Sequence, residues 1–293
     1  MYEFNTIKEL MEISDKNNIS IAEVVMRKEM EFSEKSIEVI KEKMKLNLTI
    51  MKEAIKDGLA KEIKSVSGLT GGEGITFEKY RTSKESLTGG IVAKSISYSL
   101  SVSGINAAMG RIVAVPTAGS CGILPGALIA FGEEREIDDD KLTEALFIAA
   151  GIGLVIAKQA SVSGAIGGCQ AECGSASAMA AGAITYLCGG TNNQIANAVA
   201  INLKCILGLV CDPVAGLVEV PCIKRNGMGA VNAVAAADMA LAGIESVIPV
   251  DEVIKAMDKV GRALPESLRE TSLGGLAVTP TGCRLKRQVL GTE

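Results

Sequence analysis

The stretch GGCQAECGSASAMAAGAITYLCGG (residues 167–190) and the later segment CDPVAGLVEVPCIKRNGMG (residues 211–229) organise this chain. Both are rich in Gly, Ala and Ser, whose small side chains allow backbones to approach closely. They contain three cysteines that each have a turn-forming residue beside them, namely Cys169, Cys211 and Cys222. Thiols at turns can converge on a soft metal, so the pattern indicates a metal site.

The composition predicts a core of closely packed helices. Hydrophobic residues make up 48% of the 293 residues, but aromatic residues only 3%, and Trp is absent. Apolar periodicity is helical, and no long stretch alternates apolar and polar residues as a half-exposed strand does. We therefore predict a mainly α fold, a helical bundle with close small-residue packing and at most short strands. The expected helices span 91–109, from 123 onward, 142–160, 172–188, 192–210, 225–243 and 251–263, with an irregular tail over 265–293.

The first part of the chain differs from the rest in its charge. Residues 1–66 predict an N-terminal helical arm, with Ser20 and Glu23 as a capping box for a long helix over 21–63, in one or two pieces. We expect residues 67–293 to form a helical domain that holds the metal site, and the two parts to be either two domains or one continuous domain. We favour a solvated arm; the alternative is an arm for homo-oligomer formation or partner docking. A glycine-rich segment over 65–90 predicts a flexible loop.

Charge and hydropathy exclude several classes of protein. The net charge of −4 gives no basic footprint for nucleic acid or an acidic membrane. Turn residues interrupt the two longest uncharged runs, so we expect no membrane span. Eight cysteines in a chain without an apparent export signal favour reduced thiols and a cytoplasmic location. The chain contains no histidine, which removes the commonest general base and the usual zinc ligands.

A turn rich in glycine and hydroxyl groups precedes the helix expected near residue 123. It contains Thr117, Gly119, Ser120 and Gly122. A turn of this kind at a helix N-terminus offers N–H donors and the positive end of the helix dipole, which together suit a carboxylate. An ordinary helix start explains the same residues, and both interpretations stay open here.

Three segments resemble the iron–sulfur-dependent bacterial L-serine dehydratases (L-serine deaminases). They are GGCQAECGSASAMAAGA, LGLVCDPVAGLVEVPCIKRNGMGAVNA and, upstream, VPTAGSCGILPGA. The resemblance is closest to the α subunit of the two-subunit type and extends over essentially the whole chain, including the tail GGLAVTPTGC. It implies a [4Fe–4S] cluster held by Cys169, Cys211 and Cys222. It also implies that Cys283 matches a tail cysteine that reaches the fourth iron in related single-chain enzymes, although here ten residues follow it.

The resemblance further implies a function and a partner. The activity would be β-elimination of L-serine to pyruvate and ammonia, with the cluster as a Lewis acid. The family's ACT-like β domain has no counterpart here, so a β subunit is the expected partner and the enzyme a heterodimer. Lys94 is the candidate general base. The alternative interpretation is that Lys94 is an ordinary surface lysine on a helix. Arg225 and Asn226 either bind substrate or cap the helix after Cys222.

Three other functions compete with this interpretation. An L-cysteine desulfidase would use the same ligands with a thiol leaving group. A pyridoxal-phosphate dehydratase needs a Schiff-base lysine and a phosphate cup, and neither pattern is convincing. A non-catalytic iron–sulfur scaffold subunit would hold the metal without turnover.

Overall fold

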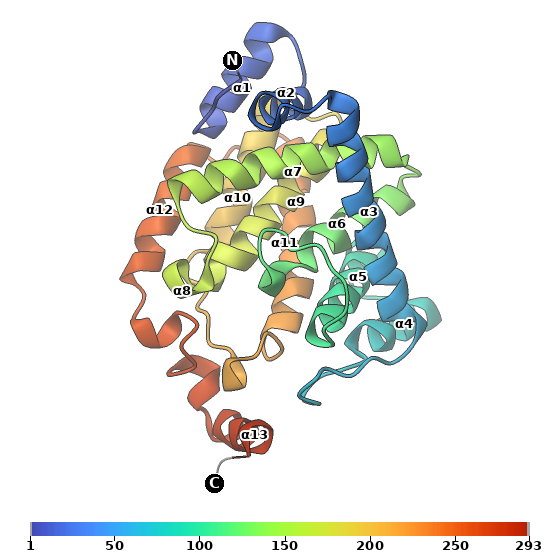
Figure 1. The fold of residues 1–293 in the computed structure, drawn as a ribbon, viewed down its shortest axis with the longest axis vertical. Coiled ribbons are helices and arrows are strands. Elements are labelled where there is room, and N and C mark those ends of the chain that lie inside the picture. The colour runs from blue at the N-terminus through green and yellow to red at the C-terminus, as the bar shows by residue number, and fades with distance from the viewer. Residues whose placement is uncertain (1, 292–293) are drawn as a thin grey trace.

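The chain folds into a bundle of α-helices, seen here in a computed structural model that describes residues 2–291 (Figure 1). Among these residues the β-type pairings are two isolated bridges, Lys64 with Gly71 and Cys211 with Arg269. The mainly α prediction is confirmed. The α-helices are α1 (Ile7–Asn17), α2 (Ile21–Ser33), α3 (Ile37–Ala60), α4 (Glu73–Ser83), α5 (Gly90–Ala107), α6 (Ile123–Glu134), α7 (Asp139–Gln159), α8 (Gly164–Gly167), α9 (Ser175–Leu187), α10 (Asn192–Ile206), α11 (Cys222–Leu241), α12 (Val250–Ala263) and α13 (Pro280–Leu290).

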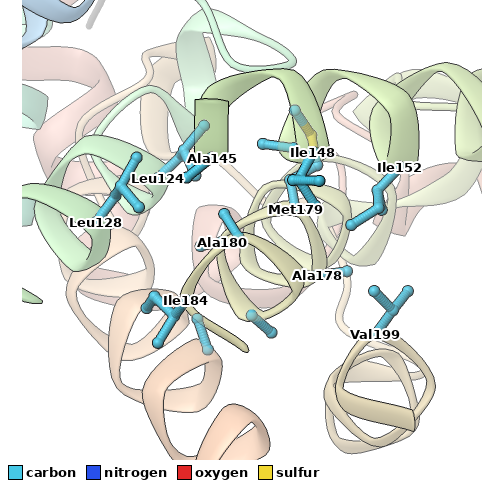
Figure 2. Close-up of a cluster of buried hydrophobic side chains, with 14 of the residues drawn as sticks. Leu124, Leu128, Ala145, Ile148, Ile152, Ala178, Met179, Ala180, Ile184 and Val199 are labelled. Carbon is cyan, nitrogen blue, oxygen red and sulfur yellow. The ribbon is translucent and has the colours of Figure 1, made fainter. Parts of the chain in front are cut away.

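Helix α9 lies at the centre of the bundle, in contact with α6, α7, α10 and α11. Its residues from Ser175 to Thr185 are all buried, which its run of Ala, Gly and Ser makes possible. Figure 2 shows larger side chains of neighbouring helices packed against this helix of small residues, among them Ile148 and Ile152 from α7 and Val199 from α10. The predicted packing through small residues is confirmed at this helix.

The N-terminal arm packs into the same core as the rest of the chain. Phe4, Ile7 and Leu10 are at most 2% exposed, and α2 contacts α7. The carboxylate of Asp251, on α12, accepts hydrogen bonds from the backbone N–H groups of Ile7 and Lys8 at 2.8 and 3.1 Å. A distant acidic side chain therefore caps the first helix. The expectation of a solvated arm is wrong for the inward faces of these helices.

Three segments differ from or refine the sequence-based prediction. The long N-terminal pattern divides into α2 and α3, because Glu34 adopts the left-handed conformation (φ 55°) that ends α2. Helix α4 forms inside the predicted flexible loop, where it packs on α5. Helix α13 forms inside the predicted irregular tail; Thr279 caps it and Pro280 is its first residue. Half of the predicted capping box is present: the Ser20 hydroxyl accepts from the Glu23 N–H at 3.1 Å, whereas the Glu23 carboxylate pairs with Arg27.

None of the described helices is long and apolar enough to cross a membrane.

Candidate metal and active site

The first site cysteine, Cys169, begins a π-helical turn, η2 (Gln170–Gly174), that leads into α9. Gly168 precedes it with φ of 73°. A Cβ at Gly168 would lie 2.7 Å from Leu264 Cδ1 and 2.9 Å from the carbonyl oxygen of Leu209, so glycine is required here for both conformation and space. The Sγ atoms of Cys169 and Cys173 are 3.3 Å apart within this turn. Single π turns are frequent at functional sites because they redirect side chains.

A buried glutamine holds this turn in place. The side chain of Gln170, 1% exposed, donates to the carbonyl of Met257 at 2.8 Å and accepts from the N–H of Gly208 at 2.9 Å. Its own N–H donates to the carbonyl of Leu209 at 3.0 Å. The end of α10, the π turn and α12 are thereby fixed to one another.

The second cysteine, Cys211, lies in the loop after α10 and pairs with the C-terminal segment. Its N–H donates to the carbonyl of Leu268 at 2.9 Å, and its carbonyl accepts from the N–H of Glu270 at 2.7 Å. Cys211 packs with Cys169 and Cys173 in one small buried cluster. The tail after α12 therefore runs past the second cysteine instead of leaving the protein.

The third cysteine, Cys222, is the first residue of α11, and Arg225 follows one turn later. Arg225 Nη1 donates to the carbonyl of Val210 at 2.8 Å. Its Nη2 lies 2.9 Å from Asp212 Oδ1, an ionic contact whose angle falls short of a hydrogen bond. The side chains of Arg225 and Asp212 are only 17% and 3% exposed, so this ion pair is largely buried.

The three predicted ligand cysteines share one electrostatic environment. Burial raises the pKa of Cys222 to about 12 and raises the pKa of Cys211 further, and each of these thiols also feels the charge of Cys169. The Cys173 thiol lowers the pKa of Cys169, with a further contribution from the Arg225 guanidinium. Buried thiolates require a nearby positive charge. Arg225 supplies one such charge, and a bound metal would supply the rest.

The predicted carboxylate-binding turn lies beside the cysteines. Thr117 leads into a short 3₁₀ turn, η1 (Ala118–Ser120), which contacts η2. The Asn226 amide bridges this turn to α11: its Oδ1 accepts from the Gly122 N–H at 2.9 Å, and its Nδ2 donates to the carbonyls of Gly119 and Cys222 at 2.7 and 2.9 Å. Both N–H bonds and the oxygen of the Asn226 amide are therefore bonded to backbone groups of the protein, and these bonds fix the turn to α11.

Two carboxylates that the sequence reasoning missed also converge here. Glu172 accepts a hydrogen bond from the Thr117 hydroxyl at 2.7 Å, and burial raises the pKa of Glu172. One carboxylate oxygen each from Glu172 and Glu270 and the Cys211 sulfur lie within 4.8 Å of one another, a group able to hold a metal ion. A Cβ at Gly164 would come within 3.1 Å of all three side chains, so that glycine leaves the space between them open.

Lys94 lies elsewhere. Its ammonium group is 2.8 Å from Glu133 and 3.1 Å from Glu134, at the C-terminal end of α6, whereas the site adjoins the N-terminal end of that helix. Twelve helical residues span about 18 Å. Burial disfavours its charge, but hydrogen bonds with the two carboxylates outweigh this and raise the pKa of Lys94. A general base requires the opposite shift, so these contacts indicate a structural ion pair.

Cys283 is also separate from the buried cysteine cluster. It lies exposed on α13, with its sulfur 4.0 Å from the carbonyl oxygen of Ala277. The segment before it is held to the site, because Leu276 N–H donates to Asp212 Oδ2 at 2.7 Å. The sequence could indicate Cys173 only through its i, i+4 spacing from Cys169. No sequence pattern indicated Glu270, whose approach depends on the path of the tail.

Comparison with known proteins identifies the family of this chain. Residues 16–277 match the family model described as serine dehydratase alpha chain. The chain is 51% identical over 288 residues to the probable L-serine dehydratase, alpha chain, of Bacillus subtilis, with 98% of this chain and 96% of that protein covered. It is 43% identical over 287 residues to the L-serine dehydratase, alpha chain, of Peptoniphilus asaccharolyticus, with 98% of each covered.

Longer relatives also match. The L-serine dehydratase TdcG of Escherichia coli is 34% identical over 287 residues, which are 94% of this chain but 62% of that protein. The matched region includes the cysteine-bearing turns and the bundle that positions them. This chain belongs to the serine dehydratase alpha chain family.

Proposed function

We propose that this chain is the catalytic subunit of a two-subunit L-serine dehydratase, which converts L-serine to pyruvate and ammonia. The observation that carries the proposal is the proximity of Cys169, Cys211 and Cys222, of which the last two both feel the charge of Cys169, with Arg225 beside Cys169 and Cys222 and the Thr117 turn next to them. We also propose a cytoplasmic location, because eight cysteines in a chain of this length and composition are typical of reduced thiols.

The donor set fits an iron–sulfur cluster. Three thiols brought together from a π turn, a loop and a helix N-terminus form a soft ligand set, and the small residues around them leave space. We assign Cys169, Cys211 and Cys222 as the ligands of a [4Fe–4S] cluster. When bound, such a cluster supplies an iron with an open position that acts as a Lewis acid on a hydroxyl. The exposed position of Cys283 leaves it outside the proposed ligand set.

The substrate carboxylate would bind at the turn formed by Thr117, Gly119 and Ser120. Gly122 and Asn226 contribute by fixing this turn, because the Gly122 N–H already donates to the Asn226 amide. The Arg225 guanidinium faces the thiols and pairs with Asp212, which favours charge balance at the cysteines as its role over substrate binding.

Glu172 is the carboxylate best placed to accept the substrate's α-proton. It is held by Thr117 and faces the turn that would bind the carboxylate. Glu172 takes the proton from C2, the electron pair of that C–H bond forms the C2–C3 double bond, and the C3–O bond breaks. The proton then passes from Glu172 to the departing hydroxide, which leaves as water, and Glu172 returns to the carboxylate form. The remaining aminoacrylate tautomerises to an imine, which water hydrolyses to pyruvate and ammonia. This assignment replaces Lys94 as the proposed base.

The test is anaerobic reconstitution of the chain together with its partner chain. We expect iron and sulfide to be bound and pyruvate to form from L-serine. The Cys211→Ser variant should lose both iron and activity, whereas Cys188→Ser, outside the site, should keep both. Faster pyruvate release from L-cysteine would assign a desulfidase instead. Iron binding without turnover of either amino acid would assign a scaffold subunit, and iron retention in Cys211→Ser would disprove the ligand assignment.

The role of Glu172 has a separate test. Glu172→Gln should retain iron but lose at least about 100-fold in kcat, the usual contribution of a positioned general base. Glu53→Gln, on the exposed face of α3, is the matched control and should leave both unchanged. A Glu172→Gln enzyme with nearly full kcat would exclude this carboxylate as the base.

A further inference from the structure

A cavity that contains none of the site cysteines opens between α2, α3 and α7. Its volume is about 510 Å³, within the range of small-molecule pockets. Val25, Ile40 and Phe147 line it and are at most 5% exposed, so they form its floor. Phe32 and Leu154 also line it but are 83% and 41% exposed. The pocket therefore has a buried apolar floor and an uncovered apolar rim.

The charges around this pocket are unlike those of the whole protein. Four lysines and two glutamates line it, a balance of +2 in a chain whose net charge is −4. Two of the lysines are already paired at one side: Lys28 lies 2.5 Å from Glu3, and Lys158 donates to the carbonyl of Phe4 at 2.9 Å. These contacts hold the N-terminal residues against the pocket. The other two lysines of the lining, Lys35 and Lys43, make no such contact with the N-terminal residues.

Lys35 and Lys43 provide that excess charge. Lys35 lies in the turn between α2 and α3, and Lys43 lies on α3. Neither ammonium group is in a salt bridge among residues 2–291; the carboxylate of Glu29, which also lines the pocket, acts on Lys43 from a longer distance. The two groups interact directly, and the Lys35 ammonium lowers the pKa of Lys43. Two like charges held together at an apolar opening are stabilised when an anion binds between them.

We propose that this pocket binds an anionic amphiphile, a molecule with an apolar chain and a terminal carboxylate or phosphate. The chain lies on the floor formed by Val25, Ile40 and Phe147 and covers Phe32. The anionic group binds between Lys35 and Lys43. Burial of an apolar chain accounts for the floor, and the anion accounts for the lysine pair, so a single ligand explains both features.

An acidic segment of another polypeptide would also complement the charge. The floor formed by Val25, Ile40 and Phe147 is recessed between three helices, and this favours a narrow ligand over a helix that needs a long open groove. We therefore treat polypeptide binding as an alternative outcome of the experiment.

The test measures binding of hexanoate, octanoate and decanoate to the full chain by calorimetry. Affinity should increase about fourfold for each added methylene, the factor expected for burial of that group. Decanol, without the charge, and butyrate, with little chain, should both bind at least tenfold more weakly than decanoate. Co-sedimentation with phosphatidylglycerol vesicles, run in parallel, distinguishes a lipid source of the anion from a free one.

Charge variants locate the binding site. The double variant Lys35→Glu/Lys43→Glu should weaken decanoate binding at least tenfold. The control Lys56→Glu/Lys79→Glu changes the net charge equally, from −4 to −8, at exposed positions outside the pocket, and should change the affinity less than twofold. Absence of saturable binding, equal affinity in the two double variants, or affinity independent of chain length would overturn the proposal. Loss of decanoate binding when the partner chain is added would assign the pocket to a subunit interface and overturn it too.

Discussion

At the residue scale, the site depends on side chains that would not touch a metal. Asp212 pairs with Arg225, and Asp212 also accepts from the Leu276 N–H at 2.7 Å. The same carboxylate therefore orients the cation that faces the cysteines and holds the tail that passes Cys211. Its neighbour Gly275 gives it room, since a Cβ there would lie 2.3 Å from Asp212 Oδ2.

Replacing Arg225 alone should lower the free energy of unfolding more than replacing Arg225 and Asp212 together. Arg225→Met leaves the Asp212 carboxylate, 3% exposed, without its counterion, and we expect the free energy of unfolding to fall by about 3–5 kcal/mol. In Arg225→Met/Asp212→Asn the buried charge is gone and an acceptor for Leu276 remains, so the loss should be smaller. Urea unfolding of both variants measures this. A double variant less stable than the single one would contradict the account.

Gly168 sets the direction from which Cys169 enters the site. Gly168→Ala should destabilise the protein more than Gly189→Ala by about 1–3 kcal/mol, because only the first meets packed atoms. Both glycines have φ near 75°, so the conformational cost is shared and cancels in the comparison. Urea unfolding gives the difference, and iron content should fall in Gly168→Ala alone. Equal destabilisation of the two variants would refute the steric argument.

At the element scale, the sequence predicted those helices whose signals are local. The Ser20 cap and the small-residue composition of α9 are readable from sequence because cap residues and composition act within one helix. Helix α4 was missed because its glycine-rich surroundings predict a loop, and its helix depends on packing against α5. The π turn at Cys169 was missed because it depends on Gln170 contacts with residues 38 and 87 positions away.

In the candidate site, too, residues with a local sequence signal could be predicted, and residues placed by long-range contacts could not. Cys169, Cys211 and Cys222 could be chosen from turn residues and the family motifs. Glu172 and the tail residue Glu270 could not, because their approach to Cys211 follows from the path of the tail. Lys94 was selected as a lysine on an apolar helix, and its ion pair with Glu133 depends on how α5 packs against α6.

The contact between α5 and α6 should be sensitive to acid. Burial opposes ionisation of Glu133, but hydrogen bonds from Lys94 and Tyr98 outweigh it and hold the pKa of Glu133 below 4.5. Its ionisation therefore stabilises the fold at pH values above 4.5, and this contribution is lost as the pH falls through the folded-state pKa. Because the side chain is 47% exposed, we expect less than about 1 kcal/mol.

The corresponding experiment compares the wild type with Glu133→Gln by urea unfolding between pH 7 and pH 3. The stability difference should be constant near neutral pH and shrink below pH 4.5. Glu53→Gln, whose side chain is exposed on α3, should show no such convergence. A difference between wild type and Glu133→Gln that grows on acidification would have the wrong sign for this mechanism.

At the scale of the whole molecule, the cysteine site and the pocket between α2, α3 and α7 lie in different parts of the helical bundle. The turns η1 and η2 contact each other and Cys211 pairs with the tail at Leu268 and Glu270. The tail ends in α13, which lies at the opposite end of the molecule from α1 and α2 (Figure 1). The pocket between α2, α3 and α7 lies among the N-terminal helices, which share the same hydrophobic core as α9. A ligand at that pocket would therefore act on the site only through the packed core, with no direct contact between them.

Full activity of this chain should require its partner chain. The 293 residues of this chain contain no histidine, and the longer relative TdcG has a region outside the 62% that this chain matches. We expect the chain alone to bind iron but to form pyruvate at least about 100-fold more slowly than with its partner chain, since a missing acid or base group typically costs that much. Titration of the iron-loaded chain with the partner should restore activity and saturate at a 1:1 ratio. Full serine turnover by the isolated chain would show that its own carboxylates, Glu172 among them, supply all the proton transfers.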